Sequence, residues 1–124
     1  MNPQADELKR RTKQFALDVL QYVRTQPHIS EARSINQQLV RSAAAVGANY
    51  RSACRSRSRA EFIARIGIVL EEADESGFWL EMMIEGGLGS PSDAKRLLNE
   101  ADQLSAICAA SAITAKTHQE RPGW

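Results

Sequence analysis

Hydrophobic residues recur at helical spacing in four long segments, and each segment is bounded by residues that start or stop helices. The first segment is predicted as a helix over about residues 3–25, with Asn2 as N-cap and Pro3 at the first helical position. Pro27 ends it, because the residue before a proline disfavours helical dihedrals. Its apolar stripe consists of Leu8, Phe15, Val19, Tyr22 and Val23.

The second segment starts near Ser30 or Ser34. The later start has Gln37 three residues on, which matches a capping box, so we expect a helix over about residues 34–54. Asn49 falls on the core side of this helix and should be half-buried, which requires hydrogen-bond partners. The core stripe consists of Ile35, Leu39, Val46, Tyr50 and Ala53.

Two further helices follow. Ser58 and Glu61 form a second capping box, which predicts a helix over about residues 59–86 that ends in a glycine-rich turn. Ser-Pro-Ser-Asp then starts a helix over about residues 91–116, with Pro91 at the first position. Because every linker coincides with a Pro or Gly break or a capping box, we expect residues 1–124 to form one all-α domain, a left-handed four-helix bundle.

The third helix has apolar residues on two sides. One side carries the core stripe, and on the other Phe78 and Met82 alternate with acidic residues, which implies burial against a second neighbour, most simply another subunit. The outer face of the second helix has small residues beside arginines, which would let another backbone approach. Alternatively, the alanines are present only because alanine has a high helix propensity. The predicted oligomer interface comprises Gly47, Ala48, Ile63, Gly67, Glu71, Asp74, Glu75, Phe78, Trp79 and Met82.

Charge is distributed unevenly along the chain. The net charge is only +1, but residues 1–65 carry twelve Lys or Arg against five Asp or Glu, and residues 66–124 carry four against ten. One half should therefore complement the other, within or between chains. Two cysteines without a CxxC spacing favour a reduced environment. With no signal-peptide or membrane-spanning run, we expect a soluble, cytoplasmic protein.

The sequence contains no recognisable reaction centre. A di-iron site in a helical bundle needs Glu-x-x-His spacing, which neither His28 nor His118 provides. No Gly-x-Ser-x-Gly or glycine-rich phosphate loop is present, and no nucleophile has an evident histidine base. Cys108 lies on the inward stripe of the fourth helix and is interpreted as a core residue. We therefore expect a protein that is not an enzyme and needs no metal or cofactor.

Arginines concentrate near the connection between the second and third helices, where phosphate contacts are the natural functional interpretation. Tyr50 is the only nearby aromatic residue, so a base-stacking platform is poorly supported. Alternatively, these arginines could pair with the acidic face of the third helix in an adjacent subunit. The candidate nucleic-acid-binding residues are Arg41, Arg51, Arg55, Arg57 and Arg59.

The central part of the chain resembles a known family. The resemblance covers roughly Val19 to Lys116 and rests on Arg41-Ser42, Val46 to Arg51, Cys54-Arg55, Arg57-Ser58, Ala60 to Phe62, Ile68, Glu71 to Ser76 and Trp79 to Glu81. These residues resemble the bacterial four-helix-bundle family of 23S rRNA intervening-sequence proteins. The resemblance implies an antiparallel, up-down-up-down bundle and a ring-shaped homopentamer.

That family is also similar to the accessory proteins of diversity-generating retroelements, which look like basic pentamers that bind nucleic acid and a reverse transcriptase. This chain departs from them in being nearly neutral. Two hypotheses follow: a ring-forming accessory protein that binds RNA or a nucleic-acid-processing protein, or a structural module whose arginines are used between subunits. Both have the chain itself as a partner and neither involves a membrane.

Overall fold

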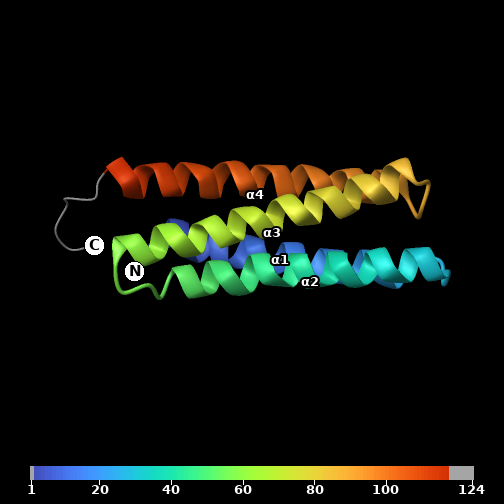
Figure 1. Cartoon of the computed structure of the whole chain (residues 1–124), viewed down its shortest axis with the longest axis horizontal. Helices are drawn as coiled ribbons and strands as arrows, with labels where there is room; N and C mark the ends of the chain where they lie inside the picture. The colour runs from blue at the N-terminus through green and yellow to red at the C-terminus, as the bar shows by residue number, and fades with distance from the viewer. Residues whose placement is uncertain (1, 118–124) are drawn as a thin grey trace.

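Four helices make up the described part of the chain, residues 2–117 of a computed structural model (Figure 1). Within these residues there is no strand, and the predicted all-α class is confirmed. Residues 118–124, with the expected tail of the domain and His118, lie outside the described part. The helices are α1 (Pro3–Arg24), α2 (Ser30–Ala53), α3 (Arg59–Glu85) and α4 (Pro91–Thr117).

The helices lie lengthwise beside one another, and each connection turns the chain back at an end of the bundle (Figure 1). α3 packs extensively against both α2 and α4, and α1 packs against α2. The contact between α1 and α4 is the smallest of the four helix pairings. The connection between α2 and α3 therefore lies at one end, and the α1–α2 and α3–α4 connections lie at the other.

Local capping explains where α1 and α3 start. The Asn2 side-chain oxygen accepts a hydrogen bond from the Gln4 backbone N–H at 3.0 Å, as predicted for an N-cap. The Ser58 hydroxyl accepts one from the Glu61 N–H at 3.0 Å. The Glu61 carboxylate in turn accepts one from the Arg57 N–H at 3.3 Å, so the predicted capping box forms one residue wider than usual.

The predicted start of α2 at residue 34 is wrong. The helix begins at Ser30, and its N-cap Ile29 makes no side-chain capping bond. Tertiary packing accounts for the extra turn, because Ala32 is fully buried at 0% exposure, and Glu31 in the first turn interacts favourably with the helix dipole. Burial of one side chain has outweighed the local capping signal at Ser34.

The core contains most of the predicted stripe residues together with buried residues that the predicted stripes did not include. On α3, Met83 and Ser76 are both 0% exposed, whereas Phe62 and Ile84, which helical periodicity places on the predicted core stripe of this helix, are only partly buried. The stripe of α3 is therefore rotated slightly from the prediction. The largest fully buried side chains include Phe15, Leu39, Ile66, Leu80, Met83, Leu97 and Leu104.

Gly47 has a different neighbour from the one predicted. A Cβ atom added there would lie 3.4 Å from the Thr12 carbonyl oxygen and 3.6 Å from the Lys13 Cα. The missing side chain thus lets α2 approach the backbone of α1 within the same chain. This corrects the expectation that Gly47 faces another subunit, because its open side is occupied by the protein's own first helix.

Candidate nucleic-acid interface

The predicted arginine cluster occupies the end of the bundle where α2 finishes and α3 starts (Figure 1). Arg51 lies in the last turn of α2, and Arg55 and Arg57 lie in the connection; all three are exposed. Arg59, the first residue of α3, is half-buried. Basic residues at the C-terminal end of a helix interact favourably with its dipole, so the position is consistent with a stable α2 terminus.

Three of these arginines have no carboxylate partner in the described chain. No ion pair within residues 2–117 involves the side chain of Arg51, Arg55 or Arg57. The backbone N–H of Arg57 is nevertheless held by Glu61, which orders the connection. The result is an ordered backbone that presents three uncompensated positive charges.

Arg65 stabilises this connection, and the sequence interpretation missed it. Its guanidinium forms an ion pair with Glu61 at 3.0 Å and a hydrogen bond with the Ser52 hydroxyl in the last turn of α2. The spacing of Glu61 and Arg65, four residues apart on one helix, was the available signal. Arg65 therefore links the first turn of α3 to the end of α2 and supports the loop between them.

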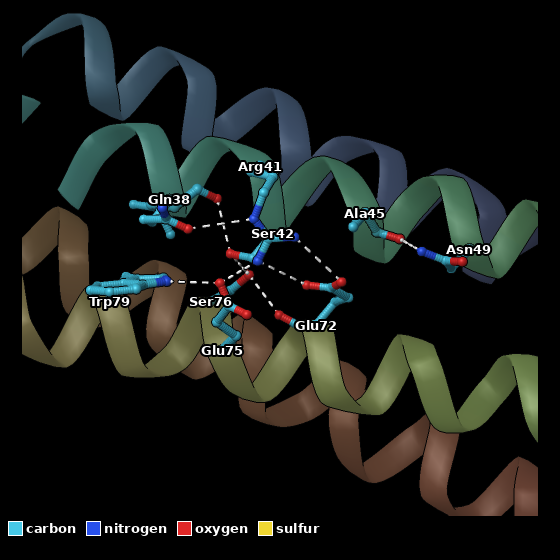
Figure 2. A network of polar contacts seen from close by, with 10 residues as sticks. Gln38, Arg41, Ser42, Ala45, Asn49, Glu72, Glu75, Ser76 and Trp79 are labelled. Carbon is cyan, nitrogen blue, oxygen red and sulfur yellow. Dashed lines mark hydrogen bonds and ion pairs between the residues drawn. The ribbon is translucent and has the colours of Figure 1, made fainter. Parts of the chain in front are cut away.

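Arg41 does not belong to the cluster. It lies in the middle of α2, where its guanidinium is within 3.4 Å of Glu72 and also pairs with Glu75, both on α3 (Figure 2). The Trp79 indole N–H donates to Glu75 at 3.0 Å. This hydrogen bond and the Arg41 guanidinium lower the pKa of Glu75. Two carboxylates of its own chain thus compensate the charge of Arg41, and its role as a phosphate contact stays a prediction.

Beside this network, α2 and α3 also meet through two buried hydroxyls. Ser42 and Ser76 are both 0% exposed, and their oxygens lie 2.9 Å apart (Figure 2). Ser42 also donates to the Leu39 carbonyl at 3.2 Å, while Ser76 lies 2.9 Å from the Glu72 carbonyl oxygen. Asn49 is half-buried, as predicted, and its Nδ2 donates a hydrogen bond to the Ala45 carbonyl at 2.9 Å. Polar groups at the α2–α3 contact are therefore largely satisfied.

The outer face of α3 presents both apolar and acidic side chains. Phe78 is 52% exposed and Met82 42% exposed, and they continue the helical stripe of Glu71 and Asp74. Ile68, which was not among the predicted interface residues, is 41% exposed on the same helix. We call Phe78, Met82, Ile68, Glu71 and Asp74 the α3 outer face. Other predicted interface residues are half-buried (Ile63, Gly67, Trp79) or exposed on α2 (Ala48).

Metal ligands, membrane-spanning helices and reactive thiols were also considered in the described part of the chain. Among residues 2–117, no group of three or more His, Cys, Asp or Glu side chains is arranged to hold a metal ion. None of the four helices is both long and apolar enough to cross a membrane. Burial raises the pKa of the Cys108 thiol to about 11, so this cysteine is a packing residue, as predicted.

Comparison with known proteins identifies a protein family and similar solved structures. A family model described as 23S rRNA-intervening sequence protein matches residues 6–110. A crystal structure from Bacteroides thetaiotaomicron, described as a protein with unknown function from the S23 ribosomal protein family, is 24% identical with a TM-score of 0.78. The match covers 87% of this chain and 96% of that one, and it shows a shared fold. None of the curated proteins matches.

Proposed function

Because the chain belongs to the 23S rRNA-intervening sequence protein family, we propose that it is a non-enzymatic, ring-forming protein that binds RNA through the α2–α3 connection. In this proposal the protomer is an antiparallel, left-handed, up-down-up-down bundle. The ring is a homopentamer that works in the cytoplasm. RNA, or a protein that processes nucleic acid, is its partner.

One observation carries the RNA-binding role: Arg51, Arg55 and Arg57 are exposed at one end of the bundle without an ion pair among residues 2–117. Unpaired arginines attract phosphate oxygens and release counterions when they bind. A ring would bring several copies of this end together and multiply a local charge that the nearly neutral chain lacks as a whole. A further phosphate contact by Arg59 stays a prediction.

The test is a double charge reversal, Arg55→Glu with Arg57→Glu. We expect RNA affinity to fall by at least tenfold, and the dependence of log affinity on log salt to flatten by about 1.5 if two single-strand phosphate contacts are lost. The matched control reverses Lys13 and Lys95, two exposed lysines that form no ion pair in the described chain, on α1 and α4. Filter binding measures RNA affinity, and light scattering on the same samples measures the size of the oligomer.

The alternative function is a structural assembly module, and the acidic side chains of α3 favour it. Glu71, Asp74 and Glu81 are exposed and have no ion pair within residues 2–117, so arginines of a neighbouring subunit could pair with them. The two functions predict different results for the same variant. If the charge reversal dissociates the ring, the arginines act at the interface; an intact ring that binds RNA like the parent excludes the phosphate contacts.

A further inference from the structure

α1 carries an exposed apolar stripe that neither of the functions proposed above uses. Leu17 is 48% exposed and Leu20 is 36% exposed. Both lie on one face of the helix with Arg24, because the three residues follow one another at spacings of three and four positions. The buried residues of α1, among them Phe15 and Val19, lie on the opposite side. We call Leu17, Leu20 and Arg24 the α1 outer face.

The α1 outer face and the α3 outer face lie on opposite sides of the protomer. α1 packs against α2 and α4, and within residues 2–117 its backbone does not approach that of α3, so α1 and α3 occupy diagonally opposite corners of the bundle. Each outer face lies opposite the buried residues of its own helix. One protomer therefore cannot cover its own α3 outer face with its α1 outer face. The two faces can meet only between subunits, in a head-to-tail contact.

The charges of the two helices are complementary. α1 carries five Lys or Arg against three Asp or Glu, and α3 carries two against seven. Arg24 is exposed and forms no ion pair within residues 2–117. The same holds for Glu81 and Glu85, which lie on the same turn of α3 as the exposed Met82. A contact between the two faces would therefore bring an uncompensated base to uncompensated acids beside apolar side chains.

Contacts through α2 place the two faces at about the same height along the bundle. Gly47 of α2 lies against the backbone of Thr12 on α1. Ser42, about five residues earlier on α2, lies 2.9 Å from Ser76 on α3. Because each connection turns the chain back (Figure 1), five residues back on α2 correspond to about five residues forward on α1. Ser76 is therefore about level with Leu17.

Contacts through α4 agree with this placement. Arg11 of α1 pairs with Glu100 at 2.6 Å, and a Cβ atom added at Gly77 of α3 would lie 3.4 Å from the Leu98 side chain. Either route places Phe78 within about three residues of the height of the first exposed leucine of α1. A ring whose axis runs along the bundle keeps every residue at its own height in the next subunit. The apolar residues of the two faces therefore meet when the ring closes.

We propose that the α1 outer face of one subunit docks on the α3 outer face of a second copy of the chain, and that this contact repeats around the ring. The inference rests on the ring-forming role proposed above and names the two faces that build the ring. The leucines pack on Phe78 and Met82, and Arg24 pairs with Glu81 or Glu85. This contact lies toward the end of α3, whereas the arginine cluster lies beside its start, so the cluster stays free for RNA.

Cross-linking between subunits tests the contact directly. The chain with Leu20→Cys and Met82→Cys, in a background of Cys54→Ala and Cys108→Ala, is treated with a short bismaleimide and run on a denaturing gel. We expect a ladder of covalent dimers and higher oligomers, because each subunit presents one thiol to each of its two neighbours. Either new thiol alone should leave the chain monomeric on the gel. Efficient dimers from a single-thiol variant would show a two-fold contact and overturn the proposal.

Removal of the apolar side chains provides an independent measurement. Leu17→Ser with Leu20→Ser should raise the concentration at which the ring half-dissociates by at least about tenfold, as measured by analytical ultracentrifugation. Both leucines are exposed in the protomer, so the helical circular dichroism signal should be retained.

A charge swap tests the ion pair. Arg24→Glu should weaken assembly severalfold, and adding Glu81→Arg with Glu85→Arg should recover it, because the opposite charges then face each other again. Arg33→Glu is the matched control and should assemble like the parent, since Arg33 is an exposed arginine of α2 that forms no ion pair within residues 2–117.

The outcomes separate this contact from the function it rests on. A parent chain that sediments as a monomer at micromolar concentration overturns the ring-forming role itself. A parent ring that gives no cross-links, and that the leucine variant and the Arg24 reversal leave intact, overturns only the docking of α1 on α3. RNA binding is judged separately, with the charge reversal at Arg55 and Arg57.

Discussion

Burial distinguishes the two thiols of this protein. Cys108 is 1% exposed in the core, whereas Cys54 is half-buried at the C-terminal end of α2. Removal from water disfavours a thiolate, which is why the pKa of Cys108 rises from its usual 9.0 to about 11. The thiolate is the reactive form, so Cys108 should stay inert under conditions where an accessible cysteine reacts.

The shifted thiol should make stability depend on pH. Because the pKa of Cys108 is higher in the folded state, its contribution is complete below about pH 9 and is lost as pH rises through about 11. We predict that the free energy of unfolding, measured by urea denaturation, falls between pH 8 and pH 10.5, and falls less in Cys108→Ala. Equal losses in the parent and the variant would show that this thiol does not contribute.

At the scale of elements, the contact between α2 and α3 combines an exposed ion-pair network with two buried hydroxyls. The network of Arg41, Glu72 and Glu75 is partly solvated, and exposed ion pairs contribute little to stability, typically about 0–1 kcal/mol. The Ser42–Ser76 hydrogen bond lies in the core, where an unpaired hydroxyl would be costly. We therefore expect the serine pair to specify how these two helices align.

A double-mutant cycle measures this contribution. Ser42→Ala and Ser76→Ala should each reduce the free energy of unfolding by about 1 kcal/mol. Together they should cost less than the sum, by roughly 0.5–1 kcal/mol, because both remove the same hydrogen bond. Ser34→Ala, at an exposed position of the same helix, should change stability by less than about 0.5 kcal/mol. Strict additivity of the two core substitutions would contradict a shared bond.

For the whole molecule, the exposed apolar residues indicate where copies of the chain should meet. Phe78 packs edge to face on Trp79, with ring centroids 5.0 Å apart, yet it is 52% exposed, and Met82 lies one turn further along α3. In the proposed ring these side chains become buried. Their removal should therefore affect assembly more than the protomer's own folding.

Phe78→Ser combined with Met82→Ser should dissociate the assembly, as measured by light scattering, while the helical circular dichroism signal is retained. Ile113→Ser is the matched control, since Ile113 is a 62% exposed apolar residue on a different helix, α4. An assembly that survives the α3 changes, or that dissociates only with the control, would place the subunit contact elsewhere.

By itself the sequence determined the four helices and most of their ends, because caps and breaks act within a few residues. The N-caps Asn2 and Ser58, together with the proline and glycine residues between the helices, were sufficient to predict these helix ends. The exposure of Arg51, Arg55 and Arg57 also followed from their place beside a predicted connection.

Only the tertiary structure decided which helices touch through which side chains. It starts α2 at Ser30, turns Gly47 toward α1, and compensates Arg41 with two carboxylates on α3. It also buries the Asn36 Oδ1 without a hydrogen-bond partner among residues 2–117. These features depend on how each helix is rotated about its own axis against partners distant in sequence. Helical periodicity specifies a face but not the neighbour that the face meets.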